Sequence, residues 1–187
     1  MKLDIIYNED CLKGMERLLD KSVDAVVTDP PFGIGFYYGK KEKINNPQAH
    51  WRFLSPIYDE IYRLLKPGGF LAIWQTALYF PYFWKWFGND IHIYAGCKNF
   101  VQLRKTSINY GFDPIIMKYK EGAIPLRPEK PKRNIDFFVA NTTRWTESIV
   151  RQHPCPRPID QVEELIKNFT IENAIVLDPF IGSGTTA

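Results

Sequence analysis

Residues 23–32 read VDAVVTDPPF, a mostly apolar run that ends in an aspartate, two prolines and an aromatic residue. The run from Val23 to Thr28 predicts a buried strand, since strands covered on both faces read as near-continuous hydrophobic segments. A second run, Ala174–Leu177, ends in the same way at Asp178. Ligands of open α/β sheets bind beyond the carboxyl ends of the strands. Asp29 and Asp178 are therefore candidate site residues.

Strand and helix patterns alternate along the chain. The apolar runs predict a strand at Ile5–Tyr7 and another at Phe70–Trp74. One helix is expected to open at Pro56, and another to be capped by Asp160. Strands that alternate with helices predict an α/β fold with a largely parallel sheet.

Length and composition indicate one globular domain. The chain has 187 residues, of which 45% are hydrophobic. It contains no apolar run near the roughly 18 residues that a membrane helix needs, and no signal peptide is visible. Its three cysteines, Cys11, Cys97 and Cys155, form no Cys-x-x-Cys pair, which argues against a disulfide framework or a zinc site. We expect a cytoplasmic protein with reduced thiols, no bound metal and no membrane partner.

Positive charge is concentrated in one part of the chain. Residues 98–157 hold 12 lysines and arginines against 5 acidic residues, whereas the net charge of the whole chain is only +3. Within this region, residues 120–158 are rich in proline and contain the cluster Lys130-Pro131-Lys132-Arg133. This pattern predicts an irregular basic insertion that contacts a polyanion, although a solvated basic surface has the same composition.

The stretch from Gly182 to Ala187 fits the pattern G-x-G-x-x-G/A that follows a strand in nucleotide-binding folds. Glycines at these positions let the backbone approach a cofactor closely, and Asp178 can accept hydrogen bonds from a polar ligand group. A tight turn from a strand into a helix needs the same glycines, so this pattern alone leaves both interpretations open.

The segment Asp29-Pro30-Pro31-Phe32 suits chemistry on the amino group of a nucleobase. Such an amine is a poor nucleophile, because its lone pair is delocalised into the ring. A carboxylate and a neighbouring backbone carbonyl that accept its hydrogen bonds favour the geometry needed for attack. The prolines fix the direction of that carbonyl, and Phe32 offers a stacking face to an extracted base. A Pro-Pro turn after a strand is the purely structural alternative.

Four segments together resemble the amino-group DNA methyltransferases. Asp29–Phe32 resembles the family's D-P-P-[YFW] catalytic motif, and Asp178–Gly184 resembles its D-P-F-x-G-S-G motif for S-adenosylmethionine. Tyr7–Cys11 is similar to the N-terminal segment whose acid contacts the cofactor adenine. His153–Pro158 resembles the H-P-x-x-K-P element, with Arg157 in place of the usual lysine, which keeps the charge but not the hydrogen-bond geometry. Glu9 stands where the family prefers glycine.

The resemblance implies a Rossmann-like methyltransferase fold with helices on both faces of the sheet. It implies catalytic roles for Asp29, Pro30, Pro31 and Phe32. It implies a cofactor pocket lined by Asp10, Cys11, Asp178, Pro179, Phe180, Gly182, Gly184 and Thr185. Phosphate contacts of double-stranded DNA are expected from Lys130, Lys132 and Arg133.

The order of the motifs, catalytic before cofactor-binding, is similar to that of the circularly permuted β-type group. The resemblance then divides the single domain into a catalytic core (1–119), a target recognition insertion (120–158) and the start of the cofactor-binding half (159–187). In the family, a helix and an acid-ended strand follow the glycine turn. We therefore expect a truncated fold without that helix and strand, in which a missing C-terminal segment or a second chain completes the cofactor site.

The resemblance implies transfer of a methyl group from S-adenosylmethionine to the exocyclic amine of a flipped base. Asp at the first motif position favours adenine N6. Cytosine N4, RNA or a protein glutamine stay open as alternatives, as does a catalytically silent DNA-binding remnant. A nicotinamide dehydrogenase could use the glycine turn, but it would leave Asp29–Phe32 unexplained.

Overall fold

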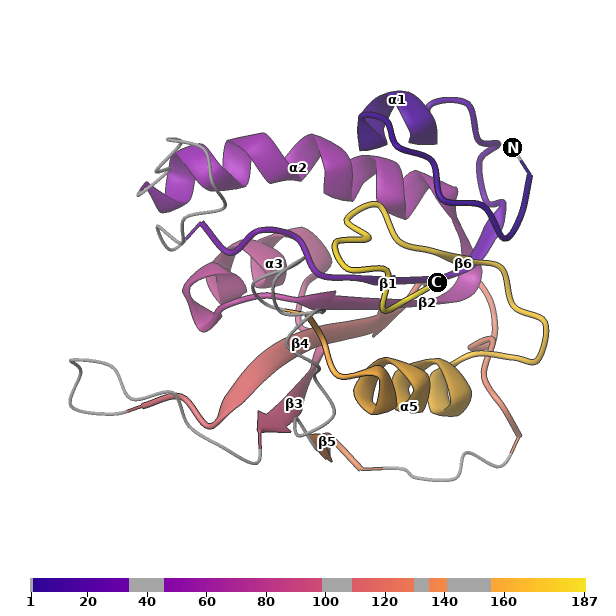
Figure 1. Cartoon of the computed structure of the whole chain (residues 1–187). Coiled ribbons are helices and arrows are strands. Elements are labelled where there is room, and N and C mark those ends of the chain that lie inside the picture. The colour runs from indigo at the N-terminus through magenta and orange to yellow at the C-terminus, as the bar shows by residue number, and fades with distance from the viewer. Residues whose placement is uncertain (1, 34–45, 99–108, 130–134, 141–155) are drawn as a thin grey trace.

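A central sheet with helices on both faces forms the body of the protein in the computed structural model, which describes residues 2–33, 46–98, 109–129, 135–140 and 156–187 (Figure 1). The strands are β1 (Val23–Thr28), β2 (Leu65–Trp74), β3 (His92–Lys98), β4 (Phe112–Tyr119), β5 (Phe137–Ala140) and β6 (Val176–Leu177). The helices are α1 (Cys11–Met15), α2 (Pro47–Leu64), the 3₁₀ helix η1 (Ala77–Tyr79), α3 (Phe80–Phe87) and α5 (Ile159–Phe169).

The strands lie in the order β5-β3-β4-β2-β1-β6. β1 is parallel to both of its neighbours, β2 and β6, and β5 is parallel to β3. Only β4 runs the other way among the described strands, since it pairs antiparallel with β2 and with β3. The predicted α/β fold with a mostly parallel sheet is confirmed.

Successive residues of the inner strands point to opposite faces of the sheet and build two cores. On one face, Val26 and Leu71 pack with the buried side of α2 and with Phe83 of α3. On the other face, Ala25 and Phe70 pack with Leu165 of α5. Figure 1 shows α2 and α5 on opposite sides of the sheet. The predicted arrangement of helices on both faces is therefore confirmed as well.

Two helix starts differ from the prediction. α2 begins nine residues before Pro56, at Pro47, where the Asn46 side chain accepts hydrogen bonds from the backbone N–H of Gln48 (2.9 Å) and of Ala49 (3.2 Å). Asn followed by Pro is a strong helix start, and Pro56 is carried inside the helix. α5 begins at Ile159 after Pro158, so Asp160 lies in the first turn rather than at the cap. At that position its carboxylate interacts favourably with the positive end of the helix dipole.

None of the helices in the described part of the chain has the length and apolar character of a membrane-spanning helix.

The predicted strand at Ile5–Tyr7 is wrong. These residues adopt no regular structure, and Ile5 and Ile6 are 50% and 59% exposed. The sheet order ends at β6, and no strand of the described part of the chain lies beyond it. A strand needs a hydrogen-bonded neighbour, so an apolar run without one stays irregular.

The packing of α5 on the sheet can be tested at Leu165, because the side chain of this residue is fully buried. Leu165→Ala is expected to lower the free energy of unfolding by about 2–5 kcal/mol, through lost burial and the cavity left behind. Ile159→Ala, in the same helix but 60% exposed, is the control and is expected to cost less than about 1 kcal/mol. Urea denaturation measures both, and equal losses would contradict this packing.

Candidate functional site

The two motifs meet at one edge of the sheet because β1 and β6 are parallel neighbours, with Val26 opposite Leu177. The Thr28 hydroxyl donates a hydrogen bond to Asp178 Oδ1 at 2.7 Å, across 150 positions of the sequence. Asp29 follows Thr28 directly. The carboxylates of the two motifs therefore lie beside each other at the carboxyl ends of their strands.

The Asp29–Phe32 turn is held by α2. The His50 side chain lies within 2.7 Å of the Pro31 carbonyl oxygen through Nε2. A carbonyl only accepts hydrogen bonds, so Nε2 carries the proton. A Cβ added at Gly33, whose φ is +62°, would lie 2.5 Å from His50 Cγ, which explains the glycine. His50 was not singled out by the sequence, because its contact spans a segment without a recognisable pattern.

Arg157 contacts the Asp29 carboxylate directly. Its Nε donates to Asp29 Oδ2 at 2.7 Å and its Nη2 donates to Asp29 Oδ1 at 2.8 Å. Its third nitrogen, Nη1, donates to Asp113 Oδ2. The guanidinium carbon lies 5.3 Å from the centre of the Phe32 ring and 5.6 Å from that of Trp74. The arginine thus joins two strands of the sheet at the site.

Charges alternate through this group of side chains. Lys98 Nζ lies 2.9 Å from Asp113 Oδ1, on the side away from Arg157. Burial acts to raise the pKa of Asp113, but the charges and hydrogen bonds of Arg157 and Lys98 outweigh it and leave that pKa below its usual value. Burial acts to lower the pKa of Arg157, yet Asp29 and Asp113 raise it above the usual arginine value. Asp113 and Arg157 are therefore both charged at neutral pH.

Asp178 is buried among hydrogen-bond donors and has no cationic side chain among its recorded partners in the described part of the chain. Burial raises its pKa and the negative charge of Asp29 adds to that effect, while hydrogen bonds from Thr28, Thr186 and the Phe180 N–H act against it. The Phe180 N–H donates to Asp178 Oδ1 at 2.9 Å. Oδ1 thus accepts from both the Thr28 hydroxyl and the Phe180 N–H.

The glycine turn beyond Pro179 has the conformation that the sequence pattern requires. Gly182 and Gly184 have φ values of +51° and +83°, in the left-handed region that favours glycine. A Cβ placed on Gly184 would meet no described atom within 4 Å. Thr185 Oγ1 donates to the Arg157 backbone carbonyl at 3.3 Å, so the turn is joined to the Asp29 side of the site. Open space beside glycine backbone is suited to a closely approaching ligand.

The N-terminal segment is placed by its own helix. Asp10 caps α1, with Oδ1 accepting a hydrogen bond from the Lys13 N–H at 3.2 Å. Cys11 is half-buried and packs on the same core as Phe180, and burial raises the pKa of its thiol. The predicted DNA contacts Lys130, Lys132 and Arg133 lie outside the described residues, as do His153, Pro154 and Cys155.

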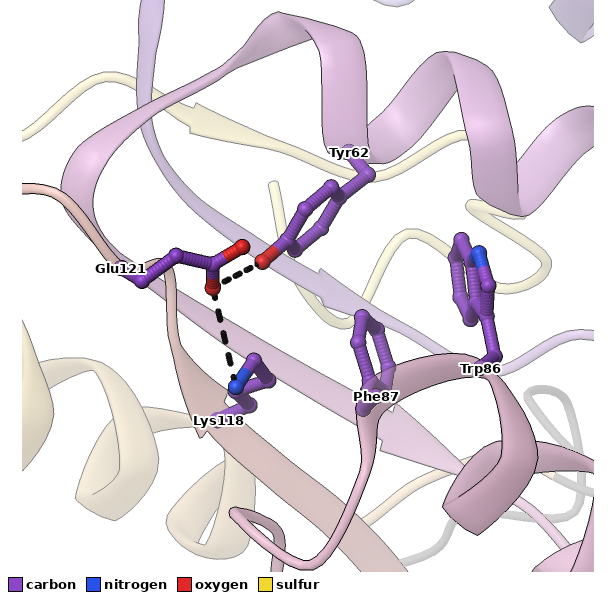
Figure 2. Close-up of a pocket in the computed structure, with 5 residues that line it drawn as sticks. All are labelled: Tyr62, Trp86, Phe87, Lys118 and Glu121. Atoms are coloured by element: carbon purple, nitrogen blue, oxygen red, sulfur yellow. Dashed lines mark hydrogen bonds and ion pairs between the residues drawn. The ribbon is translucent and has the colours of Figure 1, made fainter.

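A shallow cavity of about 220 Å³ is lined by Tyr62, Trp86, Phe87, Lys118 and Glu121 (Figure 2). It lies at the opposite end of the sheet, because Lys118 pairs with Leu71 near the start of the regular part of β2. Figure 2 shows Glu121 joined to both Tyr62 and Lys118. Lys118 is only 5% exposed and also pairs with Asp90 at 3.0 Å. The acidic residues of this cluster pair with the buried ammonium group of Lys118. None of the five lining residues belongs to the Asp29 or Asp178 motif.

The fold is shared with solved structures, one of which is described as a DNA methyltransferase. The chain superposes on the M1.HpyAVI–SAM complex with a TM-score of 0.69 and 21% identity, over 96% of this chain and 83% of that one. For the PvuII DNA methyltransferase, described as cytosine-N4-specific, the TM-score is 0.74 and the identity 16%, over 96% and 75% of the two chains.

Comparison of the sequence with known proteins assigns the chain to one family. It is 29% identical to YubD of Escherichia coli (strain K12), over 95% of this chain and 75% of that protein. It is 28% identical to the type II methyltransferase M.HpaI of Haemophilus parainfluenzae, over 94% of this chain and 63% of the relative's length. Residues 23–187 match the N6/N4 methyltransferase family described as DNA methylase, and the chain belongs to that family.

His50 provides a test by pH, because burial lowers the pKa of its imidazole despite the Pro31 carbonyl. The unfolded chain takes up the proton first, near pH 6.5, so the stability that neutral His50 contributes is present above that pH and is lost as the pH falls through the folded-state pKa. His50→Gln keeps an N–H donor but does not titrate. Between pH 7.5 and 5.5, the free energy of unfolding should fall more for the wild type than for the variant. Parallel pH profiles in urea denaturation would contradict this.

Proposed function

We propose that the protein transfers a methyl group from S-adenosylmethionine to the exocyclic amine of a base flipped out of double-stranded DNA, with adenine N6 as the favoured target. The observation that carries the proposal is the meeting of Asp29 and Asp178 through the Thr28 hydrogen bond. It gives a member of the DNA methylase family one carboxylate for the base and one for the cofactor, side by side.

In this proposal Asp29–Phe32 binds the target base. An Asp29 oxygen and the Pro30 carbonyl accept the two N–H bonds of the amine, which aligns the nitrogen lone pair with the incoming methyl group. Pro30 is buried and the turn is held through Pro31 by His50, so the acceptors are fixed before the base arrives. The base stacks on Phe32, which offsets part of the cost of leaving the duplex.

The cofactor residues keep the roles that the family resemblance gives them. The side chains and turn proposed to hold S-adenosylmethionine are Asp10, Cys11, Asp178, Pro179, Phe180, Gly182, Gly184 and Thr185. When bound there, the cofactor supplies the electrophilic methyl group. The open backbone at Gly184 and the carboxylate of Asp178 fit a ligand with an amino group. The M1.HpyAVI neighbour was solved as a complex with SAM, which supports this choice of ligand.

We also propose that the basic segment 120–158 is the target recognition region, in which Lys130, Lys132 and Arg133 contact DNA phosphates. The order of the motifs is proposed to be that of the circularly permuted group. Residues 1–119 and 159–187 are then the catalytic and cofactor-binding parts of the molecule.

Asp29→Asn tests the catalytic role and is a better variant than Asp29→Ala, which would leave Arg157 facing a void. The amide retains the shape but replaces one acceptor oxygen with a donor. Methyl transfer from tritiated S-adenosylmethionine to unmethylated DNA should fall by at least roughly 100-fold, while cofactor binding measured by calorimetry stays unchanged. Asp90→Asn is the matched control, since Asp90 also pairs with a buried cation, at the far end of the sheet. Retained activity in Asp29→Asn would defeat the proposal.

The target base is tested with two DNA pools. One pool replaces adenine with N6-methyladenine and the other replaces cytosine with N4-methylcytosine. Adenine specificity predicts that only the first pool blocks incorporation of label, and mass spectrometry of the nucleosides identifies the product. Block by the second pool alone would assign cytosine N4, the specificity named for the PvuII neighbour. A protein that binds DNA but no S-adenosylmethionine would be a silent remnant.

A further inference from the structure

Arg157 occupies the centre of the site but has no part in the chemistry proposed above. Its guanidinium holds both oxygens of Asp29 at 2.7 and 2.8 Å, in the two-pronged geometry that fixes the plane of a carboxylate. A single hydrogen bond would leave the carboxylate free to rotate about its Cβ–Cγ bond. Two parallel bonds remove that rotation.

The contact leaves room for the base amine. An ionised carboxylate has about four acceptor positions, two on each oxygen. Arg157 uses one position on Oδ1 and one on Oδ2. The described residues include no other donor to Asp29, so one position on each oxygen is available to an amine N–H while the arginine remains in place.

Arg157 is itself immobilised. Asp113 accepts from the third nitrogen of its guanidinium, and Lys98 holds Asp113 from the other side at 2.9 Å. The side chain is only 15% exposed and lies over the Phe32 and Trp74 rings. Its orientation is therefore set by residues at the ends of β1, β2 and β3 and at the start of β4, and not by the ligand.

We propose that Arg157 is a positioning residue, which acts through Asp29 by holding the carboxylate in the orientation that accepts the amine hydrogen. This role rests on the proposed function. Alignment of reacting groups is sensitive to small displacements, and a shift of about 1 Å can cost roughly 100-fold in rate. Loss of the guanidinium should therefore affect the turnover number more than the binding of either substrate.

The test compares Arg157→Ala and Arg157→Lys with the wild type, using tritiated S-adenosylmethionine and unmethylated DNA. Arg157→Ala should lower kcat by about 100-fold and change the KM for DNA and the calorimetric Kd for cofactor by less than about threefold. Arg157→Lys should recover activity in part, because an ammonium restores the charge but cannot hold both oxygens. Guanidinium chloride at millimolar concentration should restore part of the activity of Arg157→Ala and none of that of Asp29→Asn.

Arg63→Ala is the matched control, because Arg63 also bridges two carboxylates, Glu60 and Asp20, but lies on the α2 side away from the site. It should lose stability while kcat stays at the wild-type value. If Arg157→Ala does not fold, Asp113→Asn is the second probe. It loosens the arginine while Asp29 keeps its partner, and it should lower kcat at unchanged KM.

Three outcomes would overturn the proposal. A wild-type or raised kcat in Arg157→Ala would mean that the arginine is irrelevant to the base or blocks its entry. A loss of activity that follows thermal stability, without rescue by lysine or guanidinium, would make Arg157 purely structural. A wild-type protein that binds S-adenosylmethionine but methylates no DNA would defeat the proposed function, and the role of Arg157 with it.

Discussion

The parallel pairing of β1 with β2 on one side and with β6 on the other is the constraint from which the site follows. Because parallel strands end at the same edge, the residues after Thr28 and after Leu177 are brought together, although some 150 positions separate them in the chain. The hydrogen bond from Thr28 to Asp178 then fixes the distance between the two motifs. The helices on the two faces bury β1 completely, so its direction and register have little freedom.

This constraint explains which parts of the site the sequence could predict. Asp29 and Asp178 each follow a recognisable apolar run, so local pattern and the strand-end rule were sufficient to place them. That rule does not identify Asp113 as a site residue. β4 runs antiparallel, and its beginning, not its end, therefore lies at the edge where β1 and β3 finish. Only the sheet order reveals that a residue at the start of one strand contacts residues at the ends of others.

The errors in the fold have equally specific causes. The apolar spacing predicts a helix start at Pro56, but the side chain of Asn46 caps the helix nine residues earlier, at Pro47. The apolar run at Ile5–Tyr7 has strand composition but no neighbouring backbone to pair with in the described part of the chain. Composition predicts what a segment can form, whereas pairing partners decide what it does form. The basic cluster at Lys130–Arg133 lies outside the described residues, so its predicted contact with DNA stays a prediction.

The charges at the site bear on how Asp29 acts. A buried charge is costly unless it is paired, and here two carboxylates, one guanidinium and one ammonium alternate, so that the group sums to zero. Asp29 is therefore an acceptor whose charge is already balanced by Arg157 before any ligand arrives. Such a carboxylate is suited to orienting an amine through its remaining lone pairs. In the proposed reaction, the fixed plane of the Asp29 carboxylate, held by two hydrogen bonds from Arg157, favours alignment of the amine as the contribution of Asp29.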